Sequence, residues 1–363
     1  MAEEFTCAVE DAQYRSACKD LPKYSGSRYC VLHEPDEAKN KEAFEEAKKS
    51  KLDRKDYDFS GTVFPEGTAD FEGFEFDADA NFAGATFSGV NTRFNGAAFI
   101  GEADFTEATF SAVLTYFNAT FSGVNTRFNG ATFSGERTDF ERATFSGELT
   151  DFSGATFSAL NTRFDFTQFG SAETEFQEAT FVKEVAFAVA TFREKVAFWG
   201  SKENWAFDSQ AWARFDRFRI DRPELLTFNH VLLHPGWFIN ADVRKVDFTD
   251  VQWYGMPSGI EEGTLEEEIA ALTKRGVESP HALLSQACQR LSANAEGNRE
   301  YPLANEFQYW SMNALRLESW SVLYEALLKE EVRRDIEEWV CPVSTDSLPL
   351  GHSISSQSNL FVL

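Results

Sequence analysis

The sequence predicts a mainly β protein whose central part is a β-solenoid, and the arrangement of its phenylalanines is the reason. Phe accounts for 37 of the 363 residues, and from Phe59 to Phe198 successive Phe are mostly five and then six or seven residues apart. The segment FSGVNTRFNGAAF (87–99) returns almost unchanged as FSGVNTRFNGATF (121–133). A helical period of 3.6 residues does not fit these spacings, whereas stacked extended rungs do.

The residue two places before each Phe is usually small, as Ala85, Thr92, Ala131 and Thr162 are. Residues two apart in an extended segment share one face, so the Phe and its small partner both point inward. The Ser-Gly and Asn-Gly pairs that follow many Phe permit tight corners. Such repeats bury their apolar side only by stacking. Four Phe-bearing faces predict coils of about 22–24 residues that rise by roughly 4.8 Å each.

The units ADFTEATF, TDFSGATF and ANFAGATF resemble the A(D/N)(L/F)xx pattern of pentapeptide-repeat proteins, in a Phe-centred variety. This resemblance implies a right-handed quadrilateral β-helix over more than half of the chain. It implies no particular activity, because the family hosts many roles. The segment INADVRKVDFTDVQW (239–253) resembles the way in which larger members end their solenoid. We therefore expect the solenoid to span residues 57–255.

Residues 1–56 predict a cap that contains a metal site. Cys7, Cys18, Cys30 and His33 supply three thiolates and an imidazole, a donor set that suits tetrahedral zinc, and the C-x2-H spacing puts two ligands on one turn. Four protein ligands leave no open position, so we expect a structural zinc. The alternative is a set of reduced cysteines and a surface histidine without metal. Residues 34–56 predict a charged helix over the end of the solenoid, with Pro35 in its first turn.

Residues 264–340 predict a C-terminal helical region after a linker at 256–263. Its helical stripe (Leu303, Phe307, Trp310, Ala314 and Leu317) is expected to pack on the open end of the solenoid. The run REYPLANEFQYWSMNALR resembles a region that follows the repeats in some bacterial pentapeptide-repeat proteins, where it often precedes membrane spans. No apolar run in this chain approaches the roughly 18 residues of a span. The tail at 341–363 is expected to be disordered.

The net charge of −25 argues against nucleic acid as a direct partner, because phosphate binding depends on Lys and Arg. Arg93, Arg127 and Arg163 recur at equivalent places, which predicts a stripe of mixed charge on one wall. The start MAEEFTCAVEDAQ has neither a basic region nor an apolar core, so no secretory signal is expected and the predicted location is the cytoplasm. An odd number of cysteines, five, argues against a disulfide framework.

The sequence contains no convincing catalytic constellation, since no His or Cys occurs between His33 and His230. His230 and His234 flank a coil end and are expected to be capping or surface residues, with a metal pair as the alternative. We therefore expect a non-enzymatic protein–protein interaction scaffold whose protein partner the sequence does not identify. The alternatives are an acidic DNA mimic that binds a topoisomerase or another DNA-binding protein, and a carbohydrate-active β-helix enzyme.

Overall fold

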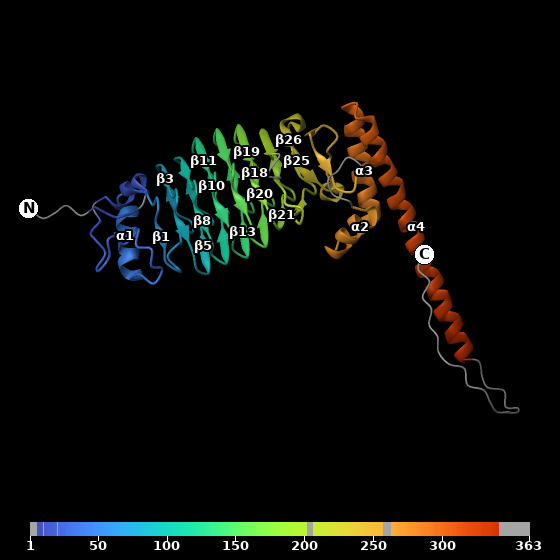
Figure 1. Ribbon diagram of the computed structural model, residues 1–363, viewed down its shortest axis with the longest axis horizontal. Coiled ribbons are helices and arrows are strands. Elements are labelled where there is room, and N and C mark those ends of the chain that lie inside the picture. Colours follow the sequence, from blue (N-terminus) through green and yellow to red (C-terminus); the bar gives the residue numbers. More distant parts are fainter. Residues whose placement is uncertain (1–5, 10, 20, 202–205, 257–262, 341–363) are drawn as a thin grey trace, which may run out of the picture. The chain divides into compact units, whose positions relative to one another are not determined.

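The computed structural model describes residues 6–9, 11–19, 21–201, 206–256 and 263–340, with side chains up to residue 321. Residues 1–315 form one compact unit and residues 316–363 a second. The first unit contains a parallel β-solenoid of about eight turns, with helices before and after it (Figure 1). The mainly β solenoid with helical ends that the sequence predicts is thereby confirmed.

The coils have four sides, and each side is a parallel sheet that we name after its first strand. The β1 wall contains β1 (Val63–Phe64), β4 (Thr86–Phe87), β8 (Thr109–Phe110), β12 (Thr132–Phe133), β16 (Thr156–Phe157) and β20 (Thr180–Phe181). The β2 wall contains β2 (Glu75–Phe76), β6 (Ala98–Phe99), β10 (Thr120–Phe121), β14 (Thr144–Phe145), β18 (Gln168–Phe169), β22 (Thr191–Phe192) and β25 (Arg219–Ile220).

The other two walls have longer strands. The β3 wall contains β3 (Ala80–Asn81), β7 (Ala103–Asp104), β11 (Asn125–Arg127), β15 (Leu149–Asp151), β19 (Glu173–Gln177), β23 (Lys195–Trp199), β26 (Leu226–Asn229) and β28 (Asp247–Thr249). The β5 wall contains β5 (Asn91–Arg93), β9 (Leu114–Tyr116), β13 (Arg137–Asp139), β17 (Asn161–Arg163), β21 (Glu184–Ala186) and β24 (Trp212–Arg214). Along the chain the walls follow the order β1, β5, β2, β3, so the β3 and β5 walls lie on opposite sides.

The core consists of four columns of stacked Phe rings, one at each side of the coil. Phe133 lies between Phe110 and Phe157 with ring centroids 4.9 and 4.8 Å away and nearly parallel planes. Rings of neighbouring columns meet edge to face, as Phe128 and Phe140 do at 5.6 Å. Offset stacks and edge-to-face contacts are the favoured geometries of aromatic pairs. One large residue type therefore fills the interior of every regular coil, which takes about 23 residues.

The corners absorb the irregularities of the repeat. Phe117 and Phe121 are only four residues apart, yet Phe121 still stacks on Phe99 at 4.8 Å and on Phe145 at 4.9 Å. At another corner a Cβ on Gly123 would lie 1.9 Å from the carbonyl oxygen of Gly101 in the preceding coil. Only glycine fits so close an approach of two backbones. The rings hold their register while the corners vary.

At the N-terminal end, the 3₁₀ helix η1 (Ala12–Cys18) and α1 (Lys41–Asp53) cover the first coil. Helix α1 begins later than the sequence suggested, because the side chain of Asn40 caps it by accepting a hydrogen bond from the Ala43 amide at 2.9 Å. Pro35 consequently lies outside the helix. Phe44 is fully buried and packs on Phe64 at 5.4 Å, so the helix covers the solenoid end as expected.

At the C-terminal end, the irregular last coils contain the 3₁₀ helices η2 (Pro223–Leu225) and η3 (Pro235–Phe238) and the short pair β27 (Leu232–Leu233) and β29 (Gln252–Trp253). They are followed by α2 (Leu265–Lys274), α3 (Pro280–Gly297) and α4 (Tyr301–Val340). Of the expected stripe, Phe307, Trp310 and Ala314 are buried.

Contacts join these helices to the last coil. Phe307 meets Trp253 edge to face at 5.1 Å. The amide of Asn294 donates to the carbonyls of Val243 and Val246, both at 2.8 Å. Within the described part of the chain, no helix has the length and apolar content needed to cross a membrane. The expected linker lies mostly, and the expected disordered tail entirely, outside the described residues.

The outward residues differ from wall to wall. The β1 wall presents a ladder of threonines, whereas the β3 and β5 walls carry most of the charged positions. Arg93 and Arg163 lie on the β5 wall, but Arg127 lies on the opposite β3 wall, so the expectation that all three share one stripe is wrong. The reason is that residues 87–99 and 121–133 begin on different sides of the coil.

Candidate metal centre

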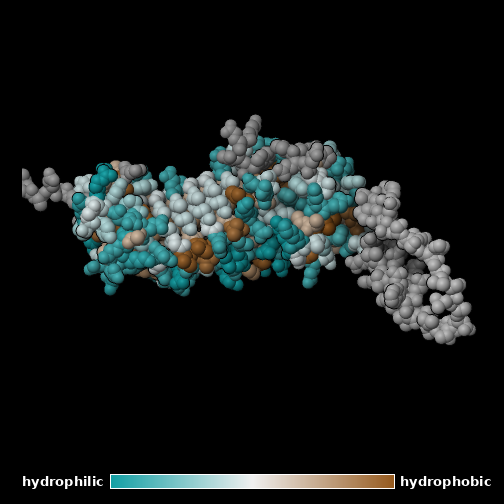
Figure 2. Space-filling model, turned by 60° about the horizontal axis from the view of Figure 1, so that its bottom comes forward, coloured by the Kyte–Doolittle hydropathy of each residue, from teal (hydrophilic) through white to brown (hydrophobic). Residues whose placement is uncertain are grey.

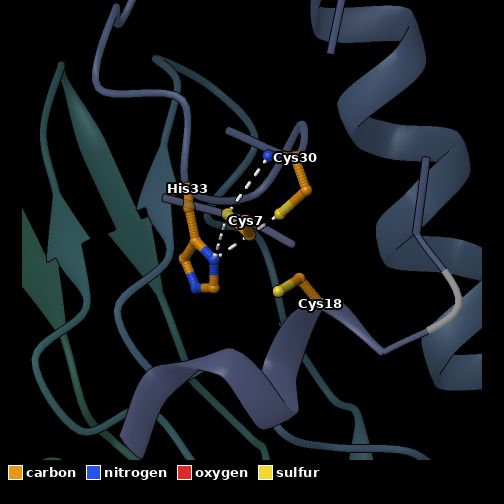
Figure 3. Close-up of side chains that lie close together, drawn as sticks. All are labelled: Cys7, Cys18, Cys30 and His33. Carbon is orange, nitrogen blue, oxygen red and sulfur yellow. Dashed lines mark hydrogen bonds between the residues drawn. The ribbon is translucent and has the colours of Figure 1, made fainter. Parts of the chain in front are cut away.

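Cys7, Cys18, Cys30 and His33, the four residues that the sequence suggested as ligands, lie together in the N-terminal cap. One possible ligand atom from each can be chosen so that all four lie within 4.8 Å of one another. Figure 3 shows the three sulfurs and the imidazole turned toward a common space between η1 and the turn that carries Cys30 and His33. The cluster is therefore close enough to bind a metal ion.

Short local structures position these ligands. Asp11 caps η1 by accepting a hydrogen bond from the Gln13 amide at 3.0 Å, and Cys18 is the last residue of this helix. Cys30 pairs with Lys23 in an antiparallel bridge. A backbone hydrogen bond of 3.0 Å from Glu34 to Cys30 then closes the turn that brings His33 back toward the thiol. The short C-x2-H spacing thus has the tight turn that it predicted.

The distances within the cluster suit a tetrahedral ion. His33 Nδ1 lies 3.5 Å from the Sγ of Cys7 and 3.5 Å from the Sγ of Cys30. Ligands bonded to one tetrahedral ion at about 2.0–2.3 Å are separated by roughly 3.5–3.8 Å. The amide of Cys30 also donates to the Cys7 sulfur at 3.3 Å.

Burial shifts the pKa values of Cys18, Cys30 and His33. Cys7, Cys30 and His33 are buried, and Cys18 is half-buried. Burial raises the pKa of the Cys18 thiol to about 11 and also raises the pKa of Cys30. Burial likewise lowers the pKa of His33, which keeps the imidazole neutral, as a metal ligand must be. A cation that replaces the thiol protons would remove the cost of burying three thiolates.

Two supporting contacts had no signal in the sequence. His33 Nε2 donates to the carbonyl of Ser60 at 2.9 Å, which leaves the lone pair of Nδ1 facing the sulfurs. Such a partner on the second nitrogen is the usual way in which a metal-binding histidine is oriented. Lys39 Nζ donates to the carbonyls of Leu32 and Glu34, both at 2.9 Å, and so holds the ligand turn. Both contacts use backbone carbonyls, which residue type does not reveal.

The other two candidate histidines have different surroundings. His234 is buried, and its Nδ1 lies 2.9 Å from a carboxylate oxygen of Glu268 in α2. His230 lies 2.8 Å from the Asn229 side-chain oxygen. Among the residues that the structure describes, the only group of three or more potential metal ligands is the N-terminal one. His230 and His234, which were expected to be capping or surface residues, both lie outside this group.

No protein-family model, no curated protein and no solved structure matches this chain.

Proposed function

We propose that the chain is a non-enzymatic scaffold of the pentapeptide-repeat type, and that a protein partner binds its β5 wall. The observation that supports this proposal most is a set of exposed apolar residues at the corner that precedes this wall. Val90, Val113 and Leu160 occupy equivalent positions there, with Glu136 at the position between Val113 and Leu160, and Val90 and Leu160 are 48% and 62% exposed. Figure 2, in which the lower side of Figure 1 is turned forward, shows apolar patches among hydrophilic residues along the solenoid.

The neighbouring positions of the β5 wall have the composition of a protein interface. Tyr116 and Arg93 face outward in one column, and Leu114 lies beside them. Tyrosine, arginine and large apolar residues contribute most of the binding energy at protein interfaces. A solid stack of Phe holds these side chains on a rigid frame, so a partner would find them already in place. A reducing, cytoplasmic location fits a protein that keeps free thiols.

The test is partner capture with wall-specific variants. Leu160→Glu on the apolar corner should weaken capture of the partner from a host lysate by about tenfold or more, because a buried carboxylate opposes an apolar contact. Thr132→Glu, on the threonine ladder of the β1 wall, is the matched control and should leave capture unchanged. The proposal fails if both variants capture the same partner equally well, or if Thr132→Glu alone loses it.

For the cap, we propose that the cluster of Cys7, Cys18, Cys30 and His33 holds a structural zinc. Three thiolates and one imidazole are a common zinc donor set, and four protein ligands leave no position for a substrate. The cap contains few apolar residues, so a metal would supply the stability that its small core does not. Its test is given with the other predictions in the Discussion.

The second candidate, imitation of DNA, has one supporting observation. Asp151, Glu173 and Glu175 lie close together on the β3 wall, where burial and then the neighbouring carboxylates raise the pKa of Glu175. Cations interrupt this acidic surface, since Arg127 pairs with Glu102 at 2.8 Å and Lys195 pairs with Glu173. A gyrase supercoiling assay tests this candidate, and the absence of both inhibition and protection would discard it.

A further inference from the structure

A cleft lies between the C-terminal part of the β5 wall and the end of α2, well away from the N-terminal cap. It has a volume of about 650 Å³, within the range of roughly 300–1,000 Å³ that small-molecule sites occupy. Its floor is formed by the outward faces of β13, β17, β21 and β24, and its side by Leu272, Lys274 and Arg275. We call it the arginine cleft, because three arginines of the wall and one beside α2 line it.

Basic side chains outnumber carboxylates among the residues that line this cleft. Five cationic side chains line it, whereas Asp165 and Glu184 are the lining carboxylates. The chain as a whole has 34 basic and 59 acidic residues. The cations are Arg137, Arg163, Arg214, Lys274 and Arg275. Each of the four arginines is paired with a carboxylate, as Arg137 is with Asp139, whereas Lys274 has no ion-pair partner among the described residues. The cleft therefore offers an anion the unused N–H donors of the paired guanidinium groups and the charge of the lysine.

The strand register leaves room between two of the arginines. Arg163 of β17 is the partner of Ala186 of β21, and Ala186 is the partner of Arg214 of β24. The two guanidinium groups therefore arise from rungs roughly 9.6 Å apart, twice the spacing of adjacent strands. The methyl group between them is too short to fill the gap. An anionic group of a ligand would fit above Ala186 with an arginine on each side.

Carboxylates beneath the cleft hold the two arginines in place. Asp165, buried in the corner after β17, accepts hydrogen bonds from Arg163 Nε at 2.9 Å and from the Ala188 amide at 3.0 Å, and it lies 3.4 Å from Arg214. Glu141 pairs with Arg163 at 3.0 Å and Asp216 with Arg214 at 3.1 Å. These pairs reduce the positive charge, but each guanidinium has five N–H donors and only some are used.

The helical side contributes two further cations of different kinds. The guanidinium of Arg275 lies over the ring of Trp212 at 4.0 Å and 3.5 Å from Glu184, which fixes its orientation. Lys274 is exposed and has no ion-pair partner among the described residues. A lysine without a partner keeps its full charge available to a ligand and is a strong attraction for phosphate or carboxylate.

We propose that the arginine cleft binds a small polyanion through two or more phosphate or carboxylate groups. One group would lie above Ala186 between Arg163 and Arg214, and another would contact Lys274. The limited volume and the covering helix favour a small molecule over a polymer, and the net charge of −25 opposes nucleic acid. The cleft uses the C-terminal part of the β5 wall and the end of α2, whereas the scaffold proposal rests on the apolar corner, so each proposal is tested with its own residues.

Isothermal titration of the full chain with inorganic pyrophosphate and, separately, with citrate tests the proposal and distinguishes the two oxyanion chemistries. We expect at least one probe to bind, and its affinity to fall as salt is added. Lys274→Ala and Arg214→Gln should each weaken binding by about tenfold, the loss expected for one charge-assisted contact. Lys274→Ala decides the question even if Arg214→Gln is destabilised, because the exposed lysine supports no described ion pair.

Arg93→Gln is the matched control. Arg93 occupies the same outward column of the β5 wall and also pairs with an acid, Asp70 at 3.4 Å, but it lies outside the cleft. Its replacement should leave the affinity unchanged. The proposal is overturned if the wild-type chain binds neither probe at millimolar concentration. It is also overturned if Arg93→Gln weakens binding as much as Lys274→Ala does, because the binding would then be diffuse attraction to the wall.

Discussion

At its N-terminal end the solenoid is closed by Phe44 together with buried lysines, whereas at its C-terminal end it is closed mainly by rings and aliphatic side chains. Lys39, Lys48 and Lys51 are buried in the N-terminal cap, and each donates to backbone carbonyls. Each ammonium group also lies between 5.0 and 5.7 Å from the centre of a Phe ring. At the other end, Trp253, Phe307 and Trp310 are buried between the last coil and the helices.

The difference follows from what each end has to bury. The exposed edge of a solenoid presents unpaired backbone groups and the outermost Phe rings, and both need a cover. The C-terminal helices have enough apolar surface to pack directly on the last coil. The short N-terminal segment does not, so it combines lysine hydrogen bonds with a cluster of metal ligands. The two ends should therefore respond to different perturbations.

The largest effect should come from removing the metal. We expect purified protein to contain about one zinc per chain, and Cys30→Ser or a strong chelator to unfold the cap, because zinc contributes on the order of 10 kcal/mol to small zinc-bound folds. Elemental analysis and hydrogen exchange of the cap amides measure the two effects. Cys288→Ser, which changes a buried cysteine of α3, should retain the metal. A metal-free chain whose cap is equally protected in Cys30→Ser would contradict the site.

The C-terminal end should instead be sensitive to loss of a ring. Phe307→Ala should lower the free energy of unfolding by about 3–5 kcal/mol, as large-to-small changes in a packed core do. Phe133→Ala, in the middle of the solenoid, should cost a similar amount because its ring is fully buried in a column. Denaturant titration measures both, and neither variant should change the zinc content. A neutral Phe307→Ala would show that the helices do not depend on this contact.

Single hydrogen-bonded side chains at the two ends should have smaller effects. Lys51→Met leaves the carbonyl of Ala17 without its donor, which lies at 3.0 Å, and Asn294→Ala does the same to two carbonyls of the last coil. We expect each to cost about 1–3 kcal/mol, the penalty for an unsatisfied buried group. Thermal unfolding measures both. Lys49→Met, an exposed position on α1, should be neutral, and an equal cost there would point to a general loss of charge.

Between the ends, one substitution should stabilise the chain slightly. The hydroxyl of Thr162 is buried without a hydrogen-bond partner among the described residues, and Val185 follows it in the same interior column. Thr162→Val should raise the free energy of unfolding by about 1 kcal/mol, since an unmet hydroxyl is replaced by a methyl group. Thr150→Val is the control and should destabilise, because the Thr150 hydroxyl bonds to Ser171 at 2.8 Å. Equal shifts in both variants would refute the explanation.

The sequence was most informative where one residue type carries one physical role. Phe at alternating spacings is buried by stacking, so the spacings predicted a β-solenoid, whereas its four-sided form was implied by the resemblance of the repeat units to a known family. The C-x2-H spacing likewise predicted a turn, and the structure brings Cys30 and His33 together on it. Cys7 and Cys18 were harder, since their longer separations in the chain imply no particular geometry.

Prediction failed where the answer depends on how elements dock. The start of α1 is determined by Asn40, whose cap competes successfully with the preference of Pro35 for a first turn. Asp139 and Asp165 are buried against arginines, an environment that no residue pattern of the repeats indicated. The arginine cleft depends on where α2 lies against the β5 wall, and no local pattern in the chain encodes that placement.

The two nearly identical segments 87–99 and 121–133 lie on different sides of the solenoid. The first runs from the β1 wall over the β5 wall to the β2 wall, and the second from the β2 wall over the β3 wall to the β1 wall. One sequence therefore builds either half of a coil, which gives the coil an approximate internal twofold symmetry. The unit that can be gained or lost during evolution is half a turn.

This symmetry separates the stability of the core from the orientation of the surface. Deleting one half-turn would restack the remaining rings without a gap, because every column accepts the same residue. All coils after the deletion would then be rotated by half a turn about the solenoid axis. The arginine cleft would consequently lie on the same side of the solenoid as the acidic β3 wall of the earlier coils. By altering the number of half-turns, a lineage could change which walls of the early and late coils face the same direction. The residues of the interior would stay the same.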